Sequence, residues 1–391
     1  MNTFLFLGTI FFFTLILGSL LEKIRVPWVF AALILGLAFA FYNPFPEITS
    51  SPTFEFLAWM GMYFLLFLIG FELDIKKIKK LGKFIIKSTF FIILFESVFG
   101  SLLIHFVFQY NWFISFLVAI SFATVGEAIL IPILEEFNLI KTKLGQTILG
   151  IGVFDDIIEI LVLILAITST SILLKTSNEF SFNIQSLFIP LILLGIIILI
   201  AVNSRKINAF LAKIKGKDVL FLLSLSLFFL FTGLNQFAEA ATLGPLFAGI
   251  FIKNFFSKEK TEAIEPIIKI VAYSFLGPIF FFWIGMDVDI KMFSPLLILA
   301  VILVSYGAKI LASYIAGKKH LGTKPSILMG VALGVRFSTS LVIIKLLFEK
   351  QLIDVKLYSI LIASSIVFKF VVPFLLSFLI QKWKTSVLKN A

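Results

Sequence analysis

The stretch "FLLFLIGFELDI" at residues 64–75 has a second version, "IFFFWIGMDVDI", at residues 279–290. Each stretch ends an apolar run with Ile-Gly, a large apolar residue, an acid, an apolar residue and Asp-Ile. By the order of apolar runs along the chain, the first copy ends the third membrane span and the second ends the tenth. Because the two positions differ by an odd number, the copies cross a membrane in opposite directions. The sequence therefore predicts an inverted-topology repeat, which is typical of secondary transporters.

The composition predicts an all-α integral membrane protein. The chain has 391 residues, of which 60% are hydrophobic and 14% are charged, and its mean hydropathy is +1.11. Apolar runs of about 18 or more residues recur, and each is long enough for a helix to cross a bilayer. We predict about thirteen transmembrane helices, at residues 3–20, 24–42, 53–72, 83–108, 112–136, 143–173, 185–204, 217–233, 237–256, 265–286, 294–316, 325–349 and 354–381.

Two of these spans contain residues that weaken a helix. They are the fifth and the twelfth spans, which occupy equivalent positions in the two repeats, and they contain "SFATVGEAILIP" (121–132) and "GVALGVRFSTS" (330–340). Gly, Ser and Thr at this depth, with Glu127 in one segment and Arg336 in the other, predict two discontinuous helices that cross near the bilayer midplane. The alternative is close packing of continuous helices through small residues.

The basic residues predict the orientation of the chain. Of the 33 Lys and Arg, 25 lie in loops on one side of the predicted spans and four lie on the other side. By the positive-inside rule the N-terminus is outside and the C-terminus is cytoplasmic. The net charge of +11 thus reflects topology rather than nucleic-acid binding. Four basic residues fall within spans, and we expect one of them, Lys345, to reach an interface by snorkelling.

Three acids occur together in the sixth span, in "GVFDDIIEI" (152–160). They are Asp155, Asp156 and Glu159, and helical spacing brings Glu159 one turn from both aspartates. Each ionised group would cost about 2.5–3.5 kcal/mol at the centre of a bilayer, so the acids must be hydrated, protonated or paired. Neighbouring carboxylates of this kind can hold a proton and exchange it for a hard monovalent cation. The alternative is a purely structural set of salt bridges.

Other charged residues also lie deep in the predicted spans. Lys309 is expected to be the ion-pair partner of one aspartate, released when a cation binds. Glu127 and Arg336 could neutralise the facing helix ends or each other, and Glu96 and Lys369 could form another buried pair. For these last four residues we favour a structural role over direct ion binding.

The chain resembles the monovalent cation:proton antiporter superfamily, in its second branch of bacterial sodium/proton or potassium/proton exchangers. The resemblance rests on "RVPWVFAALILGLAFA", "LLFLIGFELDIKKIKK", "GVFDDIIEI", "ATLGPLFAGIF" and "FFFWIGMDVDI", and it covers essentially the whole chain. It implies that Asp156 is the main cation and proton carboxylate, and that Asp155 is the second carboxylate, paired with Lys309. It places Thr124 beside the ion. An Asp-Asp pair further implies electrogenic exchange.

The same resemblance implies a division of labour within one transmembrane unit. Scaffold and dimer helices would occupy about residues 1–72 and 217–286, core transport helices about residues 83–173 and 294–381, and a linker helix about residues 185–204. A homodimer in the cell inner membrane, surrounded by lipid, is expected, with no cofactor and no C-terminal regulatory domain. Two departures concern the broken spans: Arg336 is not followed by the acid that relatives often have, and Glu127 stands where they often have an apolar residue.

These features favour exchange of protons for sodium, and also for lithium or potassium, by alternating access. A potassium/proton efflux system or a gated cation pathway is the alternative, although titratable sites suit counted exchange better than fast conduction. An acidic site would repel an organic anion. With no Cys and two His outside any metal-ligand pattern, an intramembrane enzyme is not expected.

Overall fold

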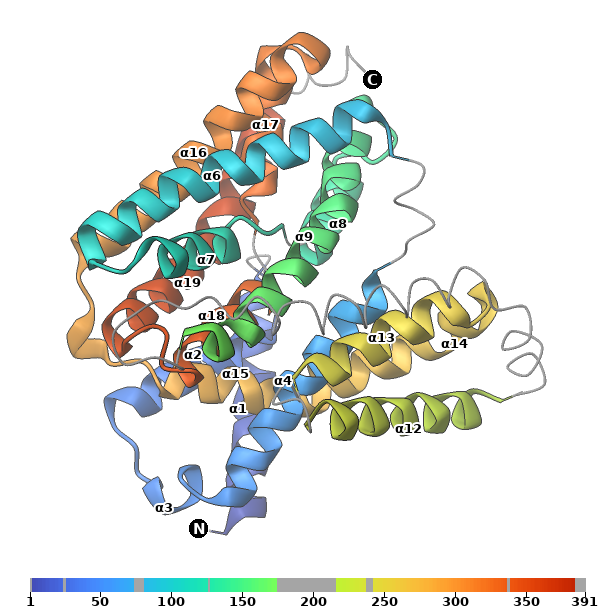
Figure 1. Ribbon diagram of the computed structural model, residues 1–391, viewed down its shortest axis with the longest axis vertical. Helices are drawn as coiled ribbons and strands as arrows, with labels where there is room; N and C mark the ends of the chain where they lie inside the picture. Colours follow the sequence, from blue (N-terminus) through green and yellow to red (C-terminus); the bar gives the residue numbers. More distant parts are fainter. Residues whose placement is uncertain are drawn as a thin grey trace.

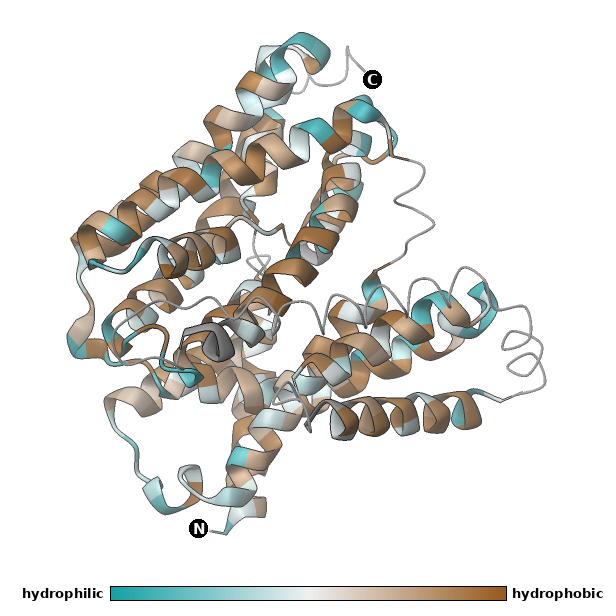
Figure 2. Cartoon of the chain, in the orientation of Figure 1, coloured by the Kyte–Doolittle hydropathy of each residue, from teal (hydrophilic) through white to brown (hydrophobic). Residues whose placement is uncertain are grey.

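The computed structural model describes residues 2–23, 26–73, 81–125, 127–173, 216–236, 242–335 and 338–383. Within these ranges every regular element is a helix and there is no strand. Seven of the described helices are long and apolar enough to cross a membrane. Figure 2 shows hydrophobic residues along most of their length and hydrophilic residues mainly near their ends. The all-α membrane fold predicted from the composition is confirmed.

The helix positions follow the predicted spans closely. The span at residues 185–204 and the first residues of the span predicted at 237–256, up to residue 241, lie outside the described residues. In the first half of the chain the helices are α1 (Thr3–Lys23), α2 (Phe30–Phe41), the short α3 (Pro46–Thr49), α4 (Pro52–Glu72), α6 (Lys83–Phe108), α7 (Trp112–Phe122), α8 (Glu127–Glu136) and α9 (Lys143–Leu173). In the second half they are α12 (Lys217–Gln236), α13 (Leu243–Phe255), α14 (Lys258–Lys269), the π-helix η1 (Ile270–Leu276), α15 (Gly277–Met286), the 3₁₀ turn η2 (Ile290–Met292), α16 (Pro295–Leu321), α17 (Thr323–Leu333), α18 (Ser338–Glu349) and α19 (Val355–Lys382).

Both predicted helix breaks are present. The span over residues 112–136 divides into α7 and α8, and the span over residues 325–349 divides into α17 and α18. At each break the helix tightens before it ends, because the amides of Ala123 and Gly334 bond to carbonyls three residues earlier. The small residues noted in the sequence therefore mark discontinuous helices rather than tight packing of continuous ones.

Two helix starts differ from the prediction. The α2 helix begins at Phe30 instead of residue 24, because Pro27 and the two residues after it form a tight turn closed by i to i−3 bonds. The tenth span begins at Lys258, seven residues early, and continues as α14, η1 and α15. Its polar first turns are helical partly because Lys258 pairs with Glu262 and Lys269 with Glu265 at i,i+4 spacing.

The internal repeat is visible as two equivalent helix crossings. The α2 helix crosses α15 at Gly36 and Gly285, and α13 crosses α4 at Gly249 and Gly70. A Cβ atom at any of these four positions would clash with a main-chain carbonyl oxygen of the opposite helix. Gly70 and Gly285 are the glycines of the two Ile-Gly motifs. The motif is thus repeated because each copy needs a close backbone approach at the same place.

The helices form two groups, which lie in the lower and upper parts of Figure 1. In the first group, residues 3–72 and 217–286 pack through the α2–α15 and α4–α13 crossings. In the second group, residues 83–173 and 295–382 pack mainly through α6, α7, α16 and α17. Contacts of α4 with α9 and α18 connect the groups close to the helix breaks. We call these the first group and the second group.

Candidate cation and proton site

Asp155 binds directly to the first helix break. It lies on α9, it is buried, and its Oδ2 accepts a hydrogen bond of 2.6 Å from the backbone N–H of Val125. Val125 lies between the end of α7 and the start of α8. The N-terminus of a helix carries a partial positive charge and free N–H groups, so a carboxylate is stabilised at this place.

Lys309 binds the C-terminal helix ends at both breaks, whereas Asp155 binds near the N-terminal end of α8. It lies on α16 with no exposed surface, and its Nζ donates hydrogen bonds of 2.8 Å to the carbonyl of Ala123 and 2.9 Å to the carbonyl of Leu333. These carbonyls lie at the C-terminal ends of α7 and α17, where the helix dipole is negative. One ammonium group therefore provides hydrogen-bond donors for free carbonyl groups at the ends of both broken helices.

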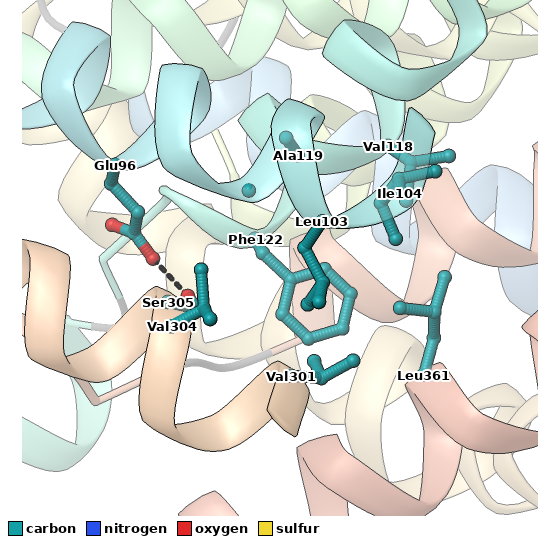
Figure 3. Close-up of a pocket in the computed structure, with 11 residues that line it drawn as sticks. Glu96, Leu103, Ile104, Val118, Ala119, Phe122, Val301, Val304, Ser305 and Leu361 are labelled. Carbon is teal, nitrogen blue, oxygen red and sulfur yellow. Dashed lines mark hydrogen bonds between the residues drawn. The ribbon is translucent and has the colours of Figure 1, made fainter. Parts of the chain in front are cut away.

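The third partner of Lys309 is Glu96 of α6. The Glu96 Oε2 lies 3.1 Å from the Lys309 Nζ, and both side chains are buried. Ser305, one helical turn before Lys309, donates a hydrogen bond to the other Glu96 oxygen, as Figure 3 shows. Lys309 thus combines two hydrogen bonds to helix-end carbonyls with an ion pair to Glu96.

The pairing of Lys309 with Glu96 was not predicted from the sequence. We expected Lys309 to pair with Asp155 and Glu96 to face Lys369, and these two pairings stay predictions beside the observed pair of Lys309 with Glu96. Lys369 is buried on α19, and its Nζ lies 3.9 Å from the ring centroid of Phe30 in α2, which is a cation–π contact. The small cavity in Figure 3 is lined by Glu96, Ser305 and apolar residues of four helices.

Glu159 lies between the two broken helices. Its buried carboxyl group interacts with the hydroxyl groups of Thr124, in the first break, and Thr339, in the first turn of α18. Asp155 and Glu72 are close enough to interact with it electrostatically. In the sequence, i,i+4 spacing relates Glu159 to Asp155 but does not show that two other helices reach it.

The remaining site residues are placed as follows. Asp156 lies next to Asp155 on α9 and is partly exposed. Thr124 is buried, and its hydroxyl donates a hydrogen bond of 3.4 Å to the Ser121 carbonyl. The side chain of Glu127 and all of Arg336 lie outside the described residues, so their proposed pairing stays a prediction. Lys345 does not extend to the protein surface, as snorkelling requires, because it is fully buried.

Together these contacts bring carboxylates, hydroxyl groups and helix ends to one place. Asp155 and Glu159 face the breaks from α9, with Asp156 next to Asp155 in the sequence, while Thr124 and Thr339 come from the broken helices. Carboxylate and hydroxyl oxygens suit hard cations, and the carboxylates can also take up protons. The site can therefore hold either a cation or protons on the same oxygen atoms.

Comparison with known proteins identifies relatives along nearly the whole chain. Residues 8–382 match the family described as "Sodium/hydrogen exchanger, transmembrane". A Na(+)/H(+) antiporter of Enterococcus hirae is 28% identical over 83% of this chain and 84% of its own length. The K(+)/H(+) antiporter subunit KhtU of Bacillus subtilis is 26% identical over 87% of this chain and 84% of its own length.

A solved structure has the same fold. A sodium proton antiporter from Methanocaldococcus jannaschii superimposes with a TM-score of 0.68, covering 96% of this chain and 98% of that protein. The two sequences are 15% identical, so this likeness concerns the fold alone. It supports the predicted architecture of about thirteen helices with an inverted repeat.

Proposed function

Because the chain belongs to the family of transmembrane sodium/hydrogen exchangers, we propose that it exchanges protons for sodium, and also for lithium or potassium, at the breaks in the two discontinuous helices. One observation carries this proposal. The Asp155 carboxylate and the Lys309 ammonium bind the same short break, one at the Val125 N–H and the other at the Ala123 carbonyl. A buried carboxylate is thus held at an opening in the helix, next to the partly exposed Asp156.

We propose that cation and protons compete for Asp156 and Asp155. Asp156 is the main carrier in this proposal because it is the partly exposed member of the pair, so that ions can reach it. Asp155 is the second carboxylate, and Thr124 contributes oxygen at the break. Since a protonated carboxyl group binds cations poorly, loading the site with protons displaces the cation. Alternating loading in this way couples the two fluxes.

Alternating access would come from motion of the second group against the first. The first group would then be the scaffold and the contact surface of a homodimer, and the second group the core that carries the ion. In this proposal the protein lies in the cell inner membrane with its N-terminus outside, and needs no cofactor. Two aspartates beside one lysine favour exchange of more than one proton per cation, which would make transport electrogenic.

Potassium/proton exchange is the second candidate. It is supported by the similarity to a K(+)/H(+) antiporter subunit, which extends over most of both chains. The oxygen donors at the site do not by themselves distinguish sodium from potassium. A gated cation pathway is less favoured, because the buried Lys309 places a positive charge at the crossing of the broken helices.

Transport into proteoliposomes that contain a pH dye tests the proposal. Sodium, lithium and potassium are added in turn to vesicles with a preformed pH gradient, with the membrane potential either free or clamped. We expect sodium to dissipate the gradient, and to do so faster when the potential is clamped. A pH record that is the same with and without each of the three cations would overturn the proposal.

A further inference from the structure

Lys345 forms a charged contact between the two helix groups. It lies on α18 in the second group, and its Nζ forms an ion pair with Asp287, the residue directly after α15 in the first group. The same Nζ lies 2.6 Å from Glu349, one turn further along α18, and 3.5 Å from the ring centroid of Trp283 in α15. The lysine has no exposed surface, so these groups replace its water.

Two further contacts lie at the same end, one between the groups and one between α19 and the segment that connects α15 to α16. The hydroxyl of Tyr358 donates a hydrogen bond of 2.8 Å to the carbonyl of Ile284, and the N–H of Asp289 donates one of 2.9 Å to the hydroxyl of Ser359. Tyr358 and Ser359 lie near the start of α19 and are fully buried. We call the three contacts, Lys345–Asp287, Tyr358–Ile284 and Ser359–Asp289, the outer seam.

The partial exposure of the two acids allows the ion pair of the outer seam to break and re-form. Lys345 is buried, but the side chains of Asp287 and Glu349 keep 24% and 26% of their surface exposed. If the groups separate, Glu349 stays with Lys345 because both lie on α18, and Asp287 can hydrate fully. Separation therefore leaves no isolated charge in a dry environment, which would otherwise be the main cost of breaking a buried ion pair.

The internal repeat provides a comparison for this contact. Asp287 and Glu72 are the equivalent acids of the two Ile-Gly motifs, at opposite ends of the first group. Asp287 meets the ammonium of Lys345, whereas Glu72 is close enough to Glu159 for the two carboxyl groups to interact. The same motif position is thus attractive toward the second group at one end and, when both acids are ionised, repulsive at the other.

We propose that the outer seam is the contact that closes the site toward the outer side of the membrane and that opens in every transport cycle. This inference rests on the proposed function, and on the orientation in which the basic loops face the cytoplasm. The attraction of Asp287 to Lys345 and the repulsion between Glu72 and Glu159 both favour the state that is closed outside. A cation from outside can therefore reach the site only after the seam has opened.

The absence of cysteine from the chain allows a direct test. In the double variant Asp289→Cys with Ser359→Cys, a disulfide or a short bis-methanethiosulfonate bridge would hold the seam closed and leave Lys345 and Asp287 in place. The matched control is Gly317→Cys with Ser326→Cys, which joins α16 to α17 within the second group, where a Cβ on Gly317 would lie 3.1 Å from the Ser326 Cβ. We expect bridging to abolish exchange by the seam pair and reductant to restore it, while the control pair exchanges in both states.

The outcomes separate the seam from the proposed function. If the double variant at positions 289 and 359 exchanges ions equally fast when bridged and when reduced, the proposal that the outer seam opens in each cycle is wrong. Absence of cation-dependent exchange in the parent protein would overturn the proposed function, and the seam with it.

A second measurement does not depend on transport. Single Ser359→Cys should react several-fold faster with a membrane-impermeant thiol reagent when Asp287→Asn is added, because removing the acid's charge weakens the closed state. An unchanged labelling rate would contradict the assignment of Asp287 to the seam.

Discussion

Lys309 and Lys345 are both fully buried, but their partners lie in different parts of the molecule. All the partners described for Lys309, namely Glu96 and the ends of α7 and α17, belong to the second group and are buried with it. Lys345 joins the second group to Asp287 of the first, and both of its acids are partly exposed. A charge whose partners move with it can hold a site together, whereas a charge whose partner stays behind can act as a contact that opens.

The largest effect is expected for Lys309→Met. It leaves Glu96 buried without this ammonium and removes a donor from two helix ends, so stability should fall by about 3–5 kcal/mol. Thermal unfolding in detergent measures the loss, and exchange in proteoliposomes should be absent. A variant that unfolds at the wild-type temperature would show that the broken helices do not depend on Lys309.

Glu96→Gln tests the same site more gently. The amide can still accept a hydrogen bond from Lys309 and contact Ser305, but the negative charge is lost, so we expect a destabilisation of about 2 kcal/mol. Glu96→Asp keeps the charge on a shorter side chain and serves as the control. If the Gln variant is as stable as wild type, the Glu96 charge is not what holds Lys309.

Lys345→Met should cost less than Lys309→Met although both lysines are equally buried. The acids that it leaves behind, Asp287 and Glu349, are exposed enough to hydrate, so we expect a loss of about 1–2 kcal/mol. The unfolding temperatures of the two variants, measured side by side, give the comparison. A larger loss for Lys345→Met would contradict the distinction drawn between the two lysines.

The smallest effect is expected for Tyr358→Phe. It removes only the hydrogen bond to the Ile284 carbonyl in the outer seam, which is worth about 1 kcal/mol. We expect little change in unfolding temperature but faster thiol labelling of a single cysteine at position 359. An unchanged labelling rate would show that this hydrogen bond does not help to keep the outer seam closed.

Much of the fold could be predicted because membrane helices leave strong signals in the sequence. Long apolar runs predicted the spans, and the similarity of the two Ile-Gly motifs predicted the repeat. The motifs are similar because each close helix crossing needs glycine. The breaks were marked by small residues next to Glu127 and Arg336. The starts of α2 and α14 were less predictable, because a tight turn and a polar first turn carry little hydropathy signal.

The partners of buried charges could not be predicted in the same way. The contact of Lys309 with Glu96 depends on how α6 and α16 are rotated about their axes, which the sequence does not specify. Lys345 was expected at an interface because it lies near the end of a span, and its acid partner Asp287 is 58 residues away. The role of Glu159 likewise depends on two breaks that bring Thr124 and Thr339 to it.

Proton release on cation binding tests the central claim most directly. Sodium, lithium or potassium is added in turn to the purified protein in weakly buffered detergent solution with a pH dye. Asp156→Asn is compared with Glu262→Gln, a change at an exposed acid of α14. If cation and protons share the carboxylates at the helix breaks, wild type and Glu262→Gln release protons and Asp156→Asn does not. Equal release by all three proteins, or release by none of them with any of the three cations, would contradict the account.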